Sequence, residues 1–519
     1  MITLRTVLSS VGLPHLSQVA SRTVGGAGTV TDTAGTRSWL HVAETAAAPP
    51  DGTDVGEVIR WYRKHHGLTQ NKAARLLTTT QPRLSKMENG NLLLGVDELR
   101  LVASKLGIPP ERLGILPDNS ADAVSRPKNV SGSPGTEMES QQRWTAIRAE
   151  LNANRAQLGD LAAELYPRSE RIPDTTVLTT ADWMPNGPVE LRDVHLSWHI
   201  GHVAKPSITG GVAQTEHVRP LTADGTRYSR YSRALRDLSR PKLLDNRCSY
   251  RLLSVSWPGG ERGSFEFDYT SYFEVLDVCE AAGHEFTEAW VNAGRKRPSF
   301  ADLPLRRRIT DPFDLTTRPM LPSINTLTIR RDPIDGHRMY LHRRDAKAVA
   351  AAGGMYHVVP AGVFQPAAVA PAHQSNDFSV WRNIQREYSE EFLGNAEHDG
   401  NAVDPIDYEQ EEPFRSFAKA REAGDFRVFA CAMVLEPLTL WVELLTVAII
   451  EAPTFDRLFV DMVNVNEEGA VISTEVGKPK VGIPFTSDAR ERLRSEPLSP
   501  IARGCISLAW EHRHRLLAS

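Results

Sequence analysis

Residues 67–90 read GLTQNKAARLLTTTQPRLSKMENG and contain two short helical patterns separated by three threonines. Thr69 precedes the first pattern and Thr80 precedes the second. A threonine in this position accepts a hydrogen bond from the first turn of the helix that follows it. The small pair Ala73–Ala74 allows a neighbouring helix to approach closely. The stretch therefore predicts two short helices that cross at a tight turn.

The second of these helices is predicted over residues 81–88. Leu84 and Met87 fall on its inner side, and Pro82 is tolerated because a proline in the first turn sacrifices no intrahelical hydrogen bond. Polar side chains remain on or near the outer side, and their amide, guanidinium, hydroxyl and ammonium groups suit base edges and phosphates of DNA. These residues are Gln81, Arg83, Ser85 and Lys86.

Helical patterns also flank the stretch. Residues 56–66 predict a helix that buries Ile59 and Tyr62 and ends at Gly67, because glycine readily takes the left-handed conformation found after helix ends. Residues 97–106 predict another helix, closed by Gly107. Lys and Arg outnumber Asp and Glu in this region, although the whole chain has a formal net charge of -4. The positive charge is thus local, as nucleic-acid binding requires.

The order and spacing of these residues resemble the phage-repressor (XRE) helix-turn-helix family over about residues 55–116. The matching positions are Ile59, Arg60, Gly67, Leu68, Thr69, Gln70, Ala73, Gln81, Ser85, Glu88, Asn89, Gly90, Leu106, Gly107 and Ile108. The resemblance implies phosphate contacts from Gln70 and Asn89, and it places Gln81, Arg83 and Lys86 in the major groove of double-stranded DNA. Such domains usually bind two half-sites as homodimers.

The candidate DNA-binding residues are therefore Gln70, Thr80, Gln81, Arg83, Ser85, Lys86 and Asn89. The alternative is a basic helical bundle that binds protein instead of DNA.

The second informative stretch is RNIQREYSEEFLG, residues 382–394. It predicts a helix over about residues 377–393, ended by Gly394, with one apolar stripe. The stripe consists of Trp381, Ile384, Tyr388 and Phe392. Another face carries Glu387, Glu390 and Glu391, which project together at spacings of three and four residues. Their mutual repulsion requires a cation or a basic neighbour.

Two interpretations of the three glutamates remain open. Carboxylate oxygens on one turn suit Mg²⁺, which could hold a diphosphate. The three residues are therefore candidate metal ligands and candidate catalytic groups. The alternative is a solvated helix face paired with arginines such as Arg382 or Arg386, since charged runs usually are solvated surface.

The segment REYSEEFLG (residues 386–394) resembles the helical half of a Nudix box, with its REUxEExG core. The preceding GGMYHVVPAGVFQP (residues 353–366) resembles the strand and loop that enter the box. The resemblance covers about residues 330–450. It implies metal-binding glutamates that cleave nucleoside diphosphates linked to another group.

Three departures distinguish this chain from the Nudix pattern. Leu393 is inserted before the glycine, the segment between Gly362 and Arg386 is longer, and Ala368 stands where a glutamate is expected. The missing carboxylate weakens the case for activating water on a metal. We therefore favour sensing of a nucleotide-like small molecule over hydrolysis, with Arg386 and Glu443 as candidate ligand-binding residues.

The chain of 519 residues exceeds what one hydrophobic core usually serves, so several domains are expected. The predicted fold is multidomain, with an all-α helix-turn-helix domain followed by an α+β or α/β Nudix-like body. Later stretches such as DPFDLTTRPMLPSINTLTIRR (residues 311–331) are similar to long bacterial regulators that join these two parts. The predicted divisions are a flexible N-terminal extension (1–50), the XRE-type domain (51–118), a linker (119–138), a connecting helix (139–175), an α+β region packed on the body (176–330) and a degenerate Nudix-like domain (331–519).

The remaining composition favours a cytoplasmic, nucleoid-associated protein. The four cysteines, Cys248, Cys279, Cys431 and Cys505, form no CxxC pair and fit a reducing compartment. The most apolar run, residues 430–450, is interrupted by Glu436, Pro437 and Glu443, so it predicts two buried strands around a turn and no membrane span.

Two further charged clusters each allow more than one interpretation. Asp277, Glu280, His284 and Glu288 fall at helical spacings that could hold a metal. We favour polar contacts inside the protein, which are the more common role of such residues. Arginines between residues 227 and 240, interleaved with Tyr228 and Tyr231, could clamp phosphates or form surface ion pairs.

The leading functional hypothesis is a sequence-specific transcriptional regulator. In it the body binds a small ligand, mediates dimerisation, or does both, and no cofactor is required. The alternative is an Mg²⁺-dependent Nudix-type pyrophosphohydrolase with a DNA-binding appendage. A third alternative is an interaction scaffold that binds protein and no DNA.

Overall fold

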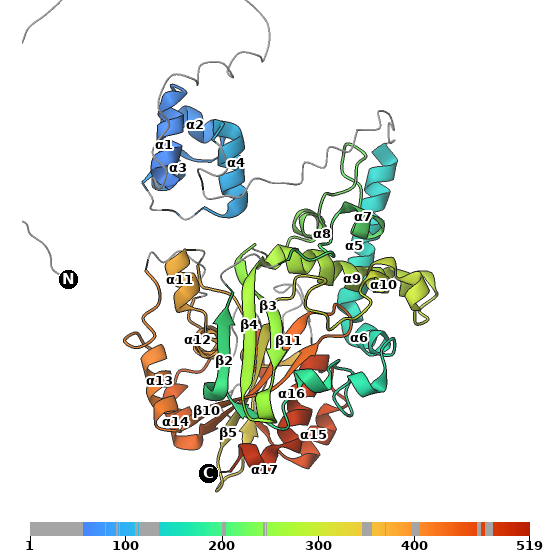
Figure 1. Ribbon diagram of the computed structural model, residues 1–519, viewed down its shortest axis with the longest axis vertical. Coiled ribbons are helices and arrows are strands. Elements are labelled where there is room, and N and C mark those ends of the chain that lie inside the picture. The colour runs from blue at the N-terminus through green and yellow to red at the C-terminus, as the bar shows by residue number, and fades with distance from the viewer. Residues whose placement is uncertain are drawn as a thin grey trace, which may run out of the picture. The chain divides into compact units, whose positions relative to one another are not determined.

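The computed structural model describes two parts of the chain, a domain of four helices and a mixed α/β body (Figure 1). The described residues are 55–77, 79–89, 92, 94–108, 113, 134–199, 204–241, 244, 246–344, 355–368, 370–396, 404–463, 469–472 and 481–518. The predicted N-terminal extension, residues 1–50, lies outside them. So do residues 119–133 of the predicted linker, whereas residues 134–138 belong to a helix.

The helices of the first part are α1 Val55–His65, α2 Gln70–Leu76, α3 Gln81–Glu88 and α4 Val96–Leu106. The predicted caps are confirmed. The Thr69 hydroxyl accepts a hydrogen bond from Lys72 N (3.3 Å), and the Thr80 hydroxyl accepts one from Arg83 N (3.4 Å). Gly67 and Gly107 follow α1 and α4 with positive φ, the conformation expected of them.

These four helices enclose a hydrophobic core of their own. Of the residues predicted to lie inside, Ile59, Ala73, Leu84 and Met87 are buried, and Tyr62 is half-buried. Ala73 has no exposed surface, as expected where two helices approach closely. Short helices gain most of their stability from such packing, because isolated helices of this length are marginal in water.

The body is built around a seven-stranded sheet in the order β1–β10–β11–β5–β6–β13, with β9 also paired to β5. Its strands are β1 Val189–Glu190, β5 Ser323–Arg331, β6 Arg338–Met339, β9 Ala361–Val363, β10 Phe426–Leu435, β11 Val442–Glu451 and β13 Ile483–Pro484. β10 and β11 form the predicted pair of buried strands around a turn, and β11 runs parallel to β5.

Helices cover both faces of this sheet, as the alternation along β11 shows. Leu444 and Ala448 pack with α9, α12, α13 and α14, whereas Leu445 and Val447 pack with α15 and α16. These helices are α9 Tyr272–Asn292, α12 Val380–Glu387, α13 Phe414–Glu422, α14 Ala452–Leu458, α15 Ser487–Leu493 and α16 Pro500–Glu511. A strand buried on both faces reads as a continuous apolar run, which is why residues 430–450 stood out in the sequence.

Two three-stranded sheets and further helices complete the described part of the body. The strands are β2 Val194–Trp198, β3 Cys248–Ser256, β4 Gly263–Ser271, β7 Leu341–Arg344, β8 Tyr356–Val358 and β12 Gly469–Ile472. The remaining α-helices are α5 Pro134–Ala153, α6 Arg155–Ala163, α7 Val212–Thr215, α8 Tyr231–Ala234, α10 Pro304–Arg308, α11 Pro371–Asn376 and α17 Arg513–Leu516.

The segment predicted as one connecting helix is two helices in the structure, α5 and α6, separated at Asn154. The Asn154 side chain donates a hydrogen bond to the carbonyl oxygen of Glu150 (2.9 Å). Asparagine side chains compete with the helical backbone in this way, which explains the break.

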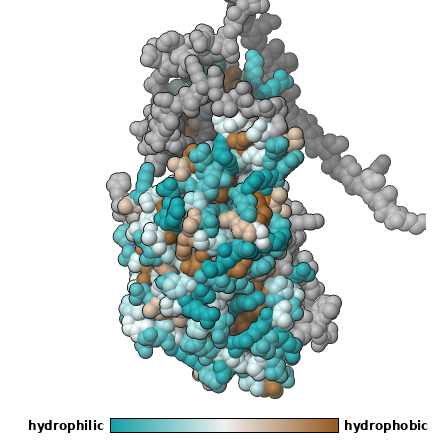
Figure 2. Space-filling view, turned by 90° about the vertical axis from the view of Figure 1, so that its right-hand side faces the viewer, coloured by the Kyte–Doolittle hydropathy of each residue, from teal (hydrophilic) through white to brown (hydrophobic). Residues whose placement is uncertain are grey.

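The surface in Figure 2 has the usual character of protein in contact with water. Hydrophilic side chains predominate on the face shown, and hydrophobic ones form small separate groups between them. Among the helices of the described ranges, none combines the length and apolar character needed to cross a bilayer.

Candidate functional site

The outer face of α3 carries the polar residues that the sequence assigned to it. Arg83 and Lys86 are exposed, and Gln81 and Ser85 are half-buried. Thr80 and Asn89 are exposed at the two ends of the helix. Leu84 and Met87 face the domain core, so the helix presents one polar side to solvent.

Hydrogen bonds hold Gln81 in place before any partner arrives. Its Nε2 donates to Gln70 Oε1 (2.7 Å), and Gln70 Nε2 donates to Glu88 Oε2 (2.9 Å). The chain of contacts connects α2 to both ends of α3. A side chain fixed in this way loses less conformational entropy when it binds.

Glu88 is the buried end of this chain and was not assigned a role from the sequence. It is 1% exposed and forms an ion pair with Arg63 of α1, whose Nη2 donates to Glu88 Oε2 (2.9 Å). Arg63 Nη1 also donates to the carbonyl oxygen of Leu68 (2.8 Å). The sequence does indicate that Glu88 is buried, because it lies four residues after Leu84 and therefore on the inner side of α3.

Arg83 and Asn89 have partners within the domain. Arg83 Nη2 lies 2.6 Å from Glu98 Oε1, and both side chains are substantially exposed. Arg60 donates to Asn89 Oδ1 and to the carbonyl oxygen of Glu88. An exposed ion pair contributes little to stability, so Arg83 can exchange Glu98 for another acceptor at small cost.

In the body, the acidic stretch departs from the regular helix that the sequence predicts. Ser379 caps α12, which ends at Glu387, and Tyr388–Phe392 continue it as a wider π-helical turn. A π turn takes in one extra residue, which accounts for the inserted Leu393. Of the predicted apolar stripe, Ile384, Tyr388 and Phe392 are buried and Trp381 is half-buried.

The three glutamates of this stretch have different surroundings. Glu391 is buried, and its Oε1 accepts a hydrogen bond from Ala361 N (2.8 Å) while its Oε2 lies 3.0 Å from Nδ1 of His342. Glu387 and Glu390 are half-buried. The carboxylate of Glu387 lies against Gly362, where an added Cβ would come within 1.9 Å of Glu387 Oε1.

The contacts of Glu391 leave this carboxylate poorly placed to bind Mg²⁺. Both oxygens of Glu391 face groups of the protein itself, a backbone N–H and an imidazole nitrogen. In the part of the chain that the structure describes, no three His, Cys, Asp or Glu side chains come together as a metal site would require.

Arg386, a candidate ligand-binding residue, faces the interior. It is 4% exposed, and it donates to the hydroxyl of Tyr408 (2.8 Å) and to the carbonyl oxygen of Gln365 (2.6 Å). Its guanidinium lies 3.5 Å from Asp377. Burial would lower the pKa of Arg386, but Tyr408 and Asp377 raise it above its ordinary value. The side chain therefore stays charged inside the fold.

Glu443, the other candidate, belongs to a chain of polar contacts across the sheet. Its Oε2 accepts from Asn325 Nδ2 (2.7 Å), and Asn325 Oδ1 lies 2.8 Å from Nε2 of His357. The other ring nitrogen of His357 lies 2.6 Å from the hydroxyl of Ser499, the residue that caps α16. The chain joins β11, β5, β8 and α16.

Of the further charged clusters, the one around Glu280 makes internal contacts, whereas Arg233, Arg236 and Arg240 of the other are exposed. Glu280 is buried between Arg148 (2.5 Å) and Arg155 (3.1 Å). His284 Nδ1 lies 3.0 Å from the hydroxyl of Tyr231, which has no exposed surface. His284 is thus the polar contact that we favoured, and Tyr231 is part of the core.

Comparison with known proteins identifies the first of these sites. Residues 59–113 match the family model described as Helix-turn-helix. No curated protein matches the chain at a significant level. The matched range coincides with the four-helix domain, so α2 and α3 form the helix-turn-helix of a DNA-binding transcriptional regulator.

Proposed function

We propose that this chain is a sequence-specific transcriptional regulator in which α3 enters the major groove of double-stranded DNA. The observation that supports this most strongly is the outer face of α3, where Gln81, Arg83 and Lys86 surround a helix whose other side is packed. Gln81 contacts a base edge from the position in which Gln70 holds it. Gln70, Thr80 and Asn89 position the domain on the phosphates.

The regulator acts as a homodimer. Helix-turn-helix domains of this type read two half-sites that lie about one helical turn of DNA apart. Dimerisation through the body raises the effective concentration of the two reading helices at such a paired site.

The body is a Nudix-like domain that binds a small, nucleotide-like ligand without hydrolysing it. Two features support the likeness, namely α12, which comes after β9 and α11 in the chain, and the packing of Gly362 against Glu387. Two features support binding over hydrolysis, namely Ala368 in place of a glutamate and the internal contacts of Glu391. A ligand regulates DNA binding only if it binds one arrangement of the dimer better than another.

The test is capture of genomic DNA fragments on the purified full-length protein, followed by sequencing and footprinting. The proposal expects a recurring paired motif and protection of two half-sites on one side of the duplex. If no duplex is retained at low salt or at high salt, the protein is not a DNA reader.

The rival function is Nudix-type pyrophosphohydrolysis, and the placement of Glu387 over Gly362 is the observation that favours it. It is tested by incubating the protein with nucleoside diphosphate derivatives and Mg²⁺ or Mn²⁺. The sensing role predicts no turnover. Turnover that disappears in Glu387→Gln and Glu390→Gln would replace sensing by catalysis.

A further inference from the structure

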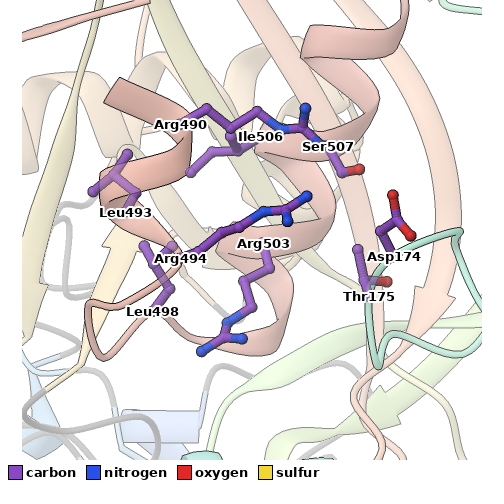
Figure 3. A pocket seen from close by; sticks show the side chains of 9 residues that line it. All are labelled: Asp174, Thr175, Arg490, Leu493, Arg494, Leu498, Arg503, Ile506 and Ser507. Atoms are coloured by element: carbon purple, nitrogen blue, oxygen red, sulfur yellow. The ribbon is translucent and has the colours of Figure 1, made fainter. Parts of the chain in front are cut away.

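A pocket of about 300 Å³ lies between α15, α16 and the turn at residues 173–175 (Figure 3). It is on the face of the central sheet opposite to α12, and none of its lining residues belongs to the sites described above. The pocket is lined by Asp174, Thr175, Arg490, Leu493, Arg494, Leu498, Arg503, Ile506 and Ser507. Its volume is at the lower end of the range for small-molecule sites.

Three guanidinium groups give the pocket a positive charge. Arg490 and Arg494 extend across it from the α15 side, and Arg503 comes from α16 (Figure 3). Arg494 lies 3.4 Å from Glu491, but both side chains are largely exposed. Within the described residues, neither Arg490 nor Arg503 forms an ion pair. The cluster therefore retains a net positive charge that an anion can neutralise.

The rest of the lining divides into an apolar part and a polar edge. Leu493, Leu498 and Ile506 are buried and contribute hydrocarbon surface. Opposite the arginines, Asp174 has φ of 58°, a left-handed conformation that aspartate tolerates better than most residues. Thr175 N donates to the carbonyl oxygen of Ile172 (3.1 Å) and closes this turn, which fixes the backbone that carries the Asp174 carboxylate.

We propose that this pocket binds the phosphate monoester of a small, polyhydroxylated metabolite. Guanidinium groups match the oxygens of a phosphate with paired hydrogen bonds, and they suit a dianion better than a single negative charge. The Asp174 carboxylate accepts hydrogen bonds from ligand hydroxyls and repels a second anionic group. The chemistry therefore favours a sugar phosphate and disfavours a bisphosphate.

The test is calorimetric titration of the full-length protein, without DNA, with glycerol 3-phosphate, ribose 5-phosphate, inorganic phosphate and ribose. At least one ester binds, ribose does not, and inorganic phosphate binds at least about tenfold more weakly than that ester. Arg490→Gln and Arg503→Gln each lower the affinity for the ester by roughly tenfold or more, the loss expected when a charged hydrogen bond is removed.

Arg492→Gln is the matched control, because Arg492 is an exposed arginine of α15 that does not line the pocket. It leaves ester binding unchanged. Asp174→Asn weakens binding of the ester and does not weaken binding of inorganic phosphate.

Failure of both esters to bind would overturn the proposal, as would equal affinities in wild type, Arg490→Gln and Arg503→Gln. Equal binding of the ester and inorganic phosphate would overturn recognition of the hydroxylated part. Because no DNA is present, none of these outcomes depends on the DNA-binding role.

Discussion

The helix α3 and the α12 helix with its π turn have similar patterns and different roles. Both are short, both bury an apolar stripe, and both carry charged residues beside it. On α3 the charged residues Arg83 and Lys86 are exposed, whereas in the second helix Arg386 and Glu391 are 4% and 2% exposed. The residue types in the sequence did not distinguish the two cases. What distinguishes them is how much of each helix is covered by other elements.

The extent to which other elements cover a charged residue also determines how much that residue contributes to stability. An exposed guanidinium contributes little to stability and can pair with a new partner. A buried one is held by several acceptors, and removing any of them is costly. Substitutions in α3 should therefore alter recognition, whereas substitutions at buried positions should alter stability, including at Glu88 within the reading domain itself.

The largest expected effect comes from Glu88→Ala. The substitution leaves Arg63 buried without its partner, and breaking a buried ion pair costs about 3–5 kcal/mol. Hydrogen exchange measured by mass spectrometry should show faster exchange throughout residues 55–108 and loss of DNA binding. Glu57→Ala, at an exposed position of α1, is the control and should exchange as wild type does. Unchanged exchange in Glu88→Ala would show that the ion pair does not hold the domain together.

In the body, Glu391→Ala should lower the free energy of unfolding by about 2–3 kcal/mol, because the N–H of Ala361 loses its acceptor in a buried site. Denaturant titration measures this change. Glu390→Ala, at a half-buried neighbour, should cost less than about 1 kcal/mol, as most substitutions away from buried contacts do. Equal losses in the two variants would contradict the distinction between the glutamates.

Arg83→Ala tests recognition on the exposed helix. It should weaken binding to the selected DNA site by about 1–3 kcal/mol if the guanidinium contacts a base, with little change in stability. Titration of a fluorescent DNA fragment gives the affinity. Lys105→Ala removes the same charge from an exposed position of α4. If both variants lose affinity equally, Arg83 contributes only general electrostatic attraction.

The smallest expected effect is that of Glu98→Gln. Because Arg83 pairs with Glu98 in the absence of DNA, removing the carboxylate should strengthen DNA binding by about 0.2–1 kcal/mol, the usual strength of an exposed ion pair. The same titration measures it. Weaker binding in Glu98→Gln would mean that Glu98 orients Arg83 toward DNA instead of competing for it.

Features determined by neighbours in the chain could be predicted from the sequence. Thr69 and Thr80 cap their helices through residues three positions later, and Gly67 and Gly107 end helices by their own conformational freedom. The strands β10 and β11 could be predicted because a sheet buried on both faces leaves a continuous apolar run in the sequence.

Features determined by distant parts of the chain could not be predicted from the sequence. The direction of Arg386 depends on Tyr408 and Gln365, which lie on separate segments. The arginine pocket joins a turn at Asp174 to helices near the end of the chain, and no local pattern relates them. The π turn after Glu387 has no sequence period of its own, although the inserted Leu393 was a sign of it.

The most direct test of the central claim measures how Gln81→Ala binds a series of duplexes that differ from the selected site by one base pair at a time. We expect wild type to discriminate at a base pair under the start of α3 by about 1–3 kcal/mol, and the variant to lose discrimination at that base pair alone. If wild type and Gln81→Ala discriminate equally at every base pair, the claim that α3 reads the DNA sequence through Gln81 is contradicted.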